Sequence, residues 1–361
     1  MLVKKFDPLK KKILEVLDYK GNIVDEKLVP NIDDDTLIKM YKTMLLGRVA
    51  DTKALQYQRQ GRMLTYAPIK GQEAAQVGVL AALEKEDWMF PAFREMAGML
   101  YKGADLKQLF LYWYGNEEGN KFSKDLKILP ISVPIASQIN HAAGVAYASK
   151  LQELNEVTVA YVGDGGTSHG EFHEGVNFAA TNALPLIVII QNNQWAISTP
   201  RSVQTIASTL AQKAVAYGIP GIQVDGNDPL AMYIATKEAK ERALKGDGPT
   251  IIEALTYRLG PHTTSDDPTI YRSDEELKYW EDRDPLIRFK KYMIDKGLWN
   301  DDLEKKQNEE YNNFVNKTFK EVEETGLIDI DEVFKYNYET MHKDLKDQIN
   351  DYKEFLESEG K

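Results

Sequence analysis

The sequence of 361 residues contains no cysteine. No disulfide, thiolate nucleophile or cysteine-bound metal centre is therefore possible. The chain also lacks any apolar run of about 18 residues, the length that a membrane-spanning helix needs, so we expect no insertion into a membrane. Its 45 basic residues are outnumbered by 56 acidic ones. The resulting net charge of −11 argues against a general affinity for nucleic acid.

The N-terminal residues have no apolar core of the kind that a signal peptide carries. Residues 1–17 are basic, but they include Asp7 and Glu15, which also argues against a transit peptide. We therefore expect a cytoplasmic protein. The hydrophobic fraction, 43%, is ordinary for a globular protein and is enough for a sizeable core.

The most informative stretch of the chain is residues 157–193. Two short, β-branched apolar runs, 157–162 and 186–190, are bounded by glycine, proline and polar residues and are typical of buried parallel strands. Between them, Ser168 and Glu171 have the spacing of a capping box, and apolar residues recur at helical spacing. The pattern predicts a strand–helix–strand unit with a right-handed crossover.

Polar residues follow both predicted strands. Because parallel strands end at the same edge of a sheet, Asp164 and Asn193 are expected to lie close together at the carboxyl ends, where open α/β sheets bind ligands. Gly163, Gly165 and Gly166 let a ligand approach the backbone, and the N-terminus of the next helix suits a phosphate. A carboxylate and an amide oxygen beside a phosphate cradle predict a magnesium site that shares its ion with a diphosphate. A plain turn is the alternative for the Asp-Gly pattern taken alone.

Other motifs built from similar residues do not fit the spacing. Ser168 stands where a dinucleotide fingerprint needs its third glycine, and the Gly-Lys-Ser/Thr of a Walker loop is absent here. Gly166 and Ser168 also occupy positions where an EF-hand loop needs ligands. His169 and His173 lie four residues apart, but the metalloprotease zinc pattern needs Glu where Gly170 stands. We interpret both histidines as surface or cofactor-lining residues.

The rest of the chain alternates predicted strands and helices, which is typical of a doubly wound, mostly parallel α/β sheet flanked by helices. Outside the central unit we expect strands at 88–91, 222–225 and 250–254. Helices are expected to begin near Leu37, Gly71, Ser137, Ile206 and Pro229. The predicted organisation is a helical N-terminal arm (1–35, with a short helix around 13–17), an α/β domain (36–290) and a helical C-terminal tail (291–361) packed on the same domain.

The Gly-Asp-Gly to Asn-Asn stretch resembles the thiamine diphosphate motif. The surrounding sequence is similar to the alpha subunits of the thiamine diphosphate-dependent 2-oxo acid dehydrogenases. The likeness runs from about Leu37 to Tyr338 and includes GRMLTYAPIKGQEAAQVG (61–78), PAFREMAGMLYKG (91–103), VDGNDPL (224–230) and YRLGPHTTSDDPTIYRS (257–273). The resemblance implies the diphosphate-binding domain of the thiamine diphosphate-binding fold, with thiamine diphosphate and Mg²⁺ as cofactors.

The resemblance also assigns residues to the cofactor site. Arg94 is implied to hold the diphosphate together with Phe93, which replaces a family tyrosine and lacks its hydroxyl. The backbone carbonyl of Trp195 is implied to complete the shell of the cation held by Asp164 and Asn193. Ala196 continues the cofactor-binding segment, and the carbonyl of Ile135 is implied to face the aminopyrimidine ring.

The loop at 260–273 supplies the implied catalytic residue. His262 matches the family's active-site histidine, which faces the reactive carbon of the cofactor, and we expect its pKa to lie near the working pH. Asp266 and Arg272 match residues that order this loop, and we expect an ion pair. Thr263 stands where animal relatives carry a phosphorylated serine, so we do not expect regulation by that route. We interpret His141 as a structural histidine, with a pocket residue as the alternative.

The function implied by the resemblance is oxidative decarboxylation of pyruvate and transfer of the acetyl group to a lipoyl-bearing acyltransferase core. The branched-chain 2-oxo acid enzymes are the nearest alternative. Residues 133–138 resemble them, whereas TYAPIKGQEA and IQVDGNDPL favour pyruvate. In two-chain members the glutamate facing the pyrimidine belongs to a beta subunit, so we expect a heterotetramer of two alpha and two beta chains that is inactive without beta.

A non-catalytic binding subunit is the alternative from another functional class. Such a chain would keep the fold but lose the residues that carry the chemistry. It predicts substitutions at Asp164, Asn193 or His262, and the sequence retains all three.

Overall fold

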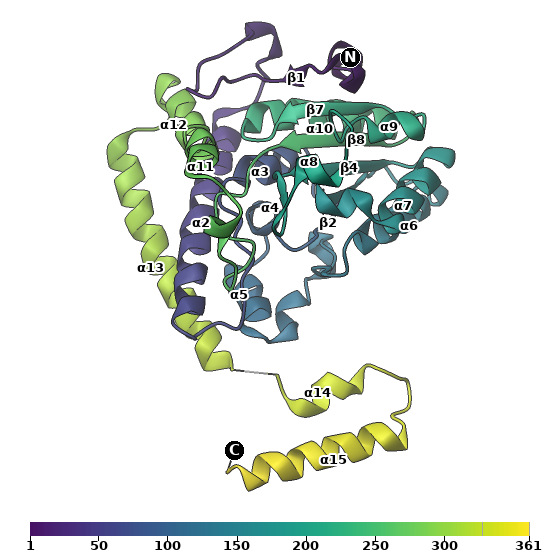
Figure 1. Cartoon of the computed structure of the whole chain (residues 1–361), viewed down its shortest axis with the longest axis vertical. Coiled ribbons are helices and arrows are strands. Elements are labelled where there is room, and N and C mark those ends of the chain that lie inside the picture. The colour runs from purple at the N-terminus through teal and green to yellow at the C-terminus, as the bar shows by residue number, and fades with distance from the viewer. Residues whose placement is uncertain (327, 361) are drawn as a thin grey trace.

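The computed structural model describes residues 1–326 and 328–360. Its centre is a six-stranded sheet in the order β1-β7-β8-β4-β3-β2, in which all neighbouring strands are parallel (Figure 1). The strands are β1 (Ile13–Leu14), β2 (Trp88–Phe90), β3 (Thr158–Gly163), β4 (Leu186–Asn192), β7 (Gly221–Asp225) and β8 (Thr250–Leu255). The predicted parallel α/β fold is confirmed.

The strand–helix–strand unit predicted over 157–193 lies within the sheet. Strands β3 and β4 pair side by side with Gly163 opposite Gln191, and α7 (Gly170–Thr181) connects them. On either side, β2 pairs with β3 and β8 pairs with β4. Because these four strands are parallel, the residues that follow them emerge at one edge of the sheet.

Helices cover both faces of the sheet, and the strands alternate their side chains between two apolar layers. Val159 and Tyr161 of β3 belong to the larger layer, which α2, α3, α10 and α12 cover, while Ala160 and Val162 belong to the layer under α6 and α7. Figure 1 shows α6 and α7 together on one side and α2 with α12 and α13 on the other. The major helices are α2 (Asp34–Arg59), α3 (Glu73–Ala81), α4 (Met96–Lys102), α5 (Leu106–Tyr114), α6 (Ser137–Leu151), α10 (Pro229–Leu244), α11 (Asp274–Glu281), α12 (Pro285–Asp295) and α13 (Asp301–Thr325). The shorter elements are α1 (Leu2–Lys5), α8 (Arg201–Gln204), α9 (Lys213–Ala216) and the β5 (Trp195–Ala196) and β6 (Thr199–Pro200) hairpin.

The N-terminal arm is less helical than predicted. After α1, it adds β1 to the edge of the sheet, parallel to β7, where a short helix around residues 13–17 was expected. The carboxylate of Asp228 accepts hydrogen bonds from the backbone N–H groups of Val16 and Leu17, each at 2.7 Å. These donors are thus satisfied by a distant side chain rather than by a helix turn, which explains the extended conformation.

The segment after β6 also differs from its prediction. A helix was expected over 206–217, but the chain forms only α9 there. The backbone N–H of Ala211 donates to the buried carboxylate of Glu253 at 2.9 Å, and Leu210 and Ala211 are fully buried. These tertiary contacts hold residues 206–212 in an irregular path against β8.

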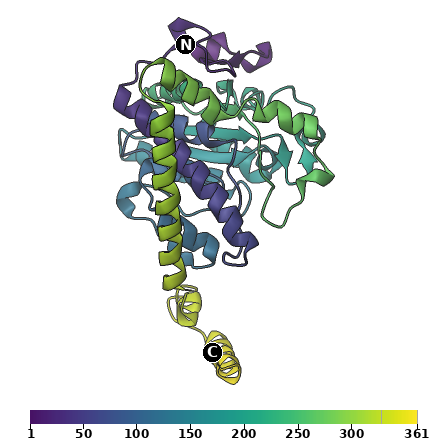
Figure 2. The same ribbon diagram turned by 90° about the vertical axis from the view of Figure 1, so that its left-hand side faces the viewer.

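The C-terminal tail has two differently packed parts. Helix α13 contributes Val315, Phe319 and Val322 to the core, and Phe319 stacks on Tyr57 of α2 with ring centroids 3.8 Å apart. Helices α14 (Ile330–Lys335) and α15 (Lys343–Ser358) project away from the α/β body (Figures 1 and 2). They depart from the expected packing on the domain: Tyr352 and Phe355 of α15 are about half exposed, and Ile349 is the one buried residue of that helix.

The division into an arm, an α/β domain and a tail stays a prediction. In the part of the chain that the structure describes, no helix is both long enough and apolar enough to cross a bilayer.

Candidate active site

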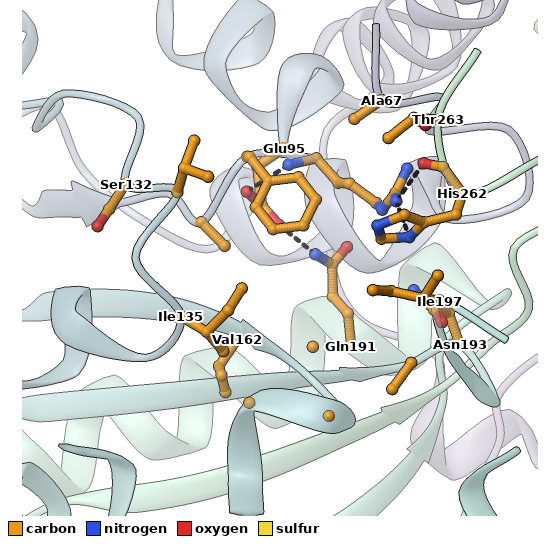
Figure 3. Close-up of a pocket in the computed structure, with 18 of the residues that line it drawn as sticks. Ala67, Glu95, Ser132, Ile135, Val162, Gln191, Asn193, Ile197, His262 and Thr263 are labelled. Atoms are coloured by element: carbon orange, nitrogen blue, oxygen red, sulfur yellow. Dashed lines mark hydrogen bonds between the residues drawn. The ribbon is translucent and has the colours of Figure 1, made fainter. Parts of the chain in front are cut away.

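A cavity of about 680 Å³ lies at the carboxyl ends of the sheet (Figure 3). Each of four neighbouring strands is followed by a residue that lines it: Arg94 after β2, Asp164 after β3, Asn193 after β4 and Arg258 after β8. The volume is that of a typical cofactor or small-molecule site. The parallel topology therefore gathers two cations, a carboxylate and an amide around one space.

All the residues proposed for the site from the sequence line this cavity. They are Phe93, Arg94, Ile135, Gly163, Asp164, Gly165, Gly166, Asn193, Trp195, Ala196 and His262. His169 lines it as well, whereas His173 bonds through Nδ1 to the hydroxyl of Tyr217 and His141 is exposed on α6. Among residues 1–326 and 328–360 there is no cluster of three or more His, Cys, Asp or Glu side chains that could hold a metal ion.

The glycines after β3 leave no room for side chains. A Cβ on Gly165 would lie 2.7 Å from the Cβ of Ala196, and one on Gly166 would lie 2.4 Å from Cγ2 of Val162. Both distances are shorter than any normal contact. The bare backbone of this turn is therefore required by its neighbours, and it is available to a ligand in the cavity.

Asp164 is a buried carboxylate, and few hydrogen bonds compensate for its loss of contact with water. Its side chain is 1% exposed, and the amide of Gln204 lies 3.4 Å from Oδ2. Burial raises the pKa of Asp164 to about 6. A divalent cation bound here would reverse that shift, because a positive charge favours the ionised carboxylate.

Asn193 is oriented by a second buried amide. Its Nδ2 donates to Oε1 of Gln72 at 3.0 Å, and the backbone N–H of Trp195 lies 3.4 Å from its Oδ1. The carbonyl of Trp195, predicted to complete the cation's shell, accepts a hydrogen bond from Nη1 of Arg258 at 2.8 Å. A carbonyl has two lone pairs, so one remains for another partner.

Two arginines are buried beside the cavity without a carboxylate partner in the described part of the chain. Arg94 is 5% exposed and donates from Nη1 to the carbonyl of Pro68 at 2.8 Å. Arg258 is 1% exposed and donates to the carbonyls of Trp195 and Ile197. Burial, and secondarily the charge of Arg258, lowers the pKa of Arg94 to about 9. Unpaired buried guanidinium groups favour an anionic ligand.

The ring of His262 packs against Arg94 and Phe93. Nδ1 of His262 lies 2.8 Å from Nη2 of Arg94 (Figure 3), and the rings of His262 and Phe93 meet edge to face with centroids 6.4 Å apart. Since a guanidinium only donates, Nδ1 is the acceptor and the ring proton sits on Nε2. His262 therefore offers one N–H donor from a neutral ring.

The expected pKa of His262 was wrong. Burial, and secondarily the charge of Arg94, lowers it to about 3 rather than leaving it near the working pH. The sequence could not reveal this shift, because Arg94 and His262 are 168 residues apart in the chain.

The loop at 260–273 is ordered by hydrogen bonds rather than by the expected ion pair between Asp266 and Arg272. Oδ2 of Asp266 accepts from the backbone N–H of His262 at 2.7 Å and from the hydroxyl of Tyr271 at 2.5 Å. Nη1 of Arg272 donates to the carbonyls of Arg258 and Gly260. Asp266 thus fixes the backbone of His262 directly.

Three non-glycine residues beside the cavity have left-handed backbones: Ala136, Gln194 and Ile197, with φ of 69°, 74° and 58°. The conformation is unfavourable for side-chain-bearing residues, and most of all for the β-branched Ile197. Such strain persists where the surrounding structure enforces a local geometry, commonly at functional sites. Here it flanks the carbonyls of Ile135 and Trp195.

A buried network behind Arg94 went unrecognised in the sequence. Glu95 accepts a hydrogen bond from the backbone N–H of Arg94 at 3.0 Å and another from Nε2 of Gln191 (Figure 3). Gln76 donates to the carbonyl of Arg94 at 2.7 Å. The backbone of Arg94 is thereby held on both sides, and burial raises the pKa of Glu95 to about 7. No local motif marks these residues, since their partners come from three separate segments.

The comparisons with known proteins agree with this geometry. Residues 41–331 match the family model described as "Dehydrogenase E1 component". The chain is 56% identical over 342 residues to the pyruvate dehydrogenase E1 component subunit alpha of Acholeplasma laidlawii, covering 94% of this chain and 99% of that protein. It is 46% identical over 343 residues to the protein of the same name from Staphylococcus aureus, covering 95% and 93%. The chain therefore belongs to the dehydrogenase E1 component family.

Proposed function

We propose that the chain is the alpha subunit of a pyruvate dehydrogenase. With a beta subunit, thiamine diphosphate and Mg²⁺, it catalyses oxidative decarboxylation of pyruvate and acetylation of the lipoyl group of an acyltransferase core. The observation that carries the proposal is the meeting of Arg94, Asp164, Asn193 and Arg258 at one edge of the sheet. Two relatives of 46% and 56% identity are named as pyruvate dehydrogenase subunits, which favours pyruvate over a branched-chain 2-oxo acid as the substrate.

The residues present fit a diphosphate with a divalent cation. Arg94 and Arg258 supply positive charge that no carboxylate in the described chain neutralises. The backbone at Gly165 and Gly166 cannot carry a Cβ, as expected of a phosphate cradle. Asp164 is a buried carboxylate, and carboxylate and amide oxygens are the ligands that Mg²⁺ prefers.

When bound, thiamine diphosphate supplies the electron sink that decarboxylation of a 2-oxo acid requires. Among the chain's own residues, Arg94 would neutralise the diphosphate, and Asp164 and Asn193 would hold the cation with the carbonyl of Trp195. His262 keeps a proton on Nε2 and would donate this N–H as a hydrogen bond to the carbonyl oxygen of the substrate.

The remaining cavity residues shape the site. The carbonyl of Ile135, which lines the cavity, would accept a hydrogen bond from the aminopyrimidine ring. Phe93 and Ala196 provide contact area and exclude water.

Exposed apolar side chains around the cavity favour the binding of a partner chain there. Leu64, Val133 and Ile197 line the cavity and are 68%, 53% and 57% exposed. Exposed apolar side chains clustered at a site are typical of an interaction surface. Within the cavity, both oxygens of Glu95 already accept hydrogen bonds from the chain itself. In our proposal the beta subunit covers these exposed side chains and supplies the glutamate that faces the pyrimidine. The enzyme is then a heterotetramer of two alpha and two beta chains.

Reconstitution with the beta subunit tests the proposed function. We expect pyruvate-dependent reduction of an artificial electron acceptor only when both subunits, thiamine diphosphate and Mg²⁺ are present. We also expect kcat/KM for pyruvate to exceed that for 2-oxoisovalerate at least about 10-fold, because a pocket fitted to a methyl group discriminates against a bulkier chain. Turnover by the chain alone, or preference for 2-oxoisovalerate, would contradict the proposal.

A further inference from the structure

Gln72, the hydrogen-bond partner of Asn193, itself lines the cavity. It is fully buried and precedes the first turn of α3. Its neighbour Gly71 has φ of +98°, and a Cβ there would lie 2.4 Å from the carbonyl oxygen of Tyr257. The hydroxyl of Thr256 donates to the carbonyl of Gly71 at 2.9 Å. The backbone before Gln72 is therefore fixed against the end of β8.

One end of the Gln72 amide controls Asn193. Oε1 of Gln72 accepts a hydrogen bond from Nδ2 of Asn193 at 3.0 Å. An amide has distinct donor and acceptor ends, so this bond sets which end of Asn193 faces Gln72. It leaves Oδ1 of Asn193, the end that can bind a cation, directed elsewhere.

The other end of the Gln72 amide is unsatisfied. Nε2 of Gln72 is buried and has no hydrogen-bond partner among the described residues. Nε of Arg258, which lines the same cavity, is likewise buried without a partner among the described residues. Buried donors are rarely left unpaired in folded proteins. Unpaired donors on two residues of one cavity indicate a ligand rich in acceptor oxygens.

We propose that Gln72 binds the diphosphate and positions Asn193. Nε2 of Gln72 donates to a diphosphate oxygen, while Oε1 holds the Asn193 amide with its oxygen toward the cation. The inference rests on the proposed function, since it assumes that a diphosphate and a divalent cation occupy this cavity. It adds a binding residue at the N-cap of α3 to those that follow the strands.

Gln138 provides a matched control within the same cavity. It is also a buried glutamine, 3% exposed, that lines the cavity and has one unpartnered amide atom. Its Nε2 donates to the carbonyl of Tyr161 at 2.7 Å, so its free atom is the acceptor Oε1. An acceptor cannot bind an anion. Replacing Gln138 therefore changes the cavity without removing a diphosphate donor.

The test uses inorganic pyrophosphate with Mg²⁺ as the ligand and the chain reconstituted with its beta subunit. Calorimetric titration should show that Gln72→Met weakens pyrophosphate binding about 10- to 100-fold, the effect of losing a hydrogen bond to a charged group. Gln138→Met should leave the affinity unchanged. Equal affinities of wild type and Gln72→Met, or equal losses for the two variants, would overturn the inference.

A double-mutant cycle tests the positioning of Asn193. In an Asn193→Ala background, Gln72→Met should cost a smaller factor in pyrophosphate binding than in wild type, because the oriented amide is already gone. An identical factor in both backgrounds would overturn the positioning part of the inference.

Two further measurements show whether a loss of binding comes from misfolding of the variant or from failure of the proposed function, rather than from the role of Gln72. Ligand-free Gln72→Met should still unfold in one cooperative transition, at a somewhat lower temperature than wild type, because Nδ2 of Asn193 loses its acceptor. If this variant does not fold, Gln72→Glu replaces it, and its added charge should weaken binding at least as much. A wild-type complex that binds neither Mg²⁺–pyrophosphate nor Mg²⁺–thiamine diphosphate would refute the proposed function itself.

Discussion

Replacing Asp164 by Asn is expected to stabilise the ligand-free chain while removing its affinity for Mg²⁺ and thiamine diphosphate. Burial raises the pKa of Asp164 to about 6 from 3.8. At neutral pH the ionised form of Asp164 is therefore less favourable in the folded chain than in the unfolded chain. The difference of roughly two pKa units corresponds to about 3 kcal/mol of lost folding free energy.

The pH dependence of this cost has a definite sign. Below pH 4 the carboxyl is protonated in both states and Asp164 costs nothing; the cost grows between about pH 4 and 6 and is complete above pH 6. Chemical unfolding of the ligand-free chain at pH 7.5 should therefore show a more stable Asp164→Asn variant. The gain should shrink as the pH falls through that window.

Binding should move in the opposite direction. Loss of the carboxylate should weaken Mg²⁺–thiamine diphosphate binding to the reconstituted complex about 10²- to 10⁴-fold, the effect of leaving one member of a buried charge pair alone. Turnover of pyruvate should fall with it. Unchanged cofactor affinity in calorimetry would be incompatible with a cation site at Asp164, and a less stable ligand-free variant would contradict the raised pKa of this carboxyl.

Asp228 offers the matched control for this substitution. It is also fully buried, and burial raises its pKa to about 6 as well. Its carboxylate, however, accepts hydrogen bonds from the backbone N–H groups of Val16, Leu17, Leu230 and Ala231. An asparagine cannot accept all of these, so Asp228→Asn should lower stability where Asp164→Asn raises it.

Replacing His262 by Phe should lower kcat of the reconstituted enzyme about 10²- to 10³-fold, as loss of one preorganised donor does. The substitution retains a ring that can pack against Phe93. It removes the Nε2 donor of the histidine and the Nδ1 atom that accepts a hydrogen bond from Arg94. Because the effect comes from a neutral donor, the shape of the pH profile should be the same in wild type and variant between pH 6 and 8. A wild-type inflection in this range that disappears in His262→Phe would show that the ring titrates during turnover.

The neutral state of His262 also predicts how the ligand-free chain responds to acid. Burial, and secondarily the charge of Arg94, lowers its pKa to about 3 from 6.5. The unfolded chain therefore binds a proton that the folded chain does not, and this group's contribution to stability falls as the pH drops from about 6.5. A diphosphate that neutralises Arg94 should raise the pKa of His262, but burial, the larger cause, remains.

The predictable part of the site followed from local sequence and one topological rule. Both strands of the 157–193 unit are marked by β-branched runs, and parallel pairing brings the residues after them to one edge. Asp164 and Asn193 could therefore be placed together without coordinates. The glycine cradle followed in the same way.

The remainder of the site depends on contacts between distant segments. The bond between Gln72 and Asn193 joins residues 121 apart, and Glu95 meets Gln191 across 96 residues. Neither pair leaves a periodic or motif signal. The edge strand β1 was misjudged for the same reason, since Asp228, which fixes the arm, lies more than 200 residues away.

In our proposal a divalent cation is held between Asp164, which follows β3, and Asn193, which follows β4. Anomalous X-ray diffraction from crystals of the reconstituted complex with thiamine diphosphate and Mn²⁺ tests it directly. The account predicts one anomalous peak within about 2.5 Å of a carboxylate oxygen of Asp164 and of Oδ1 of Asn193, beside the diphosphate. Bound thiamine diphosphate with no metal at these two side chains, or a metal held elsewhere in the cavity, would contradict it.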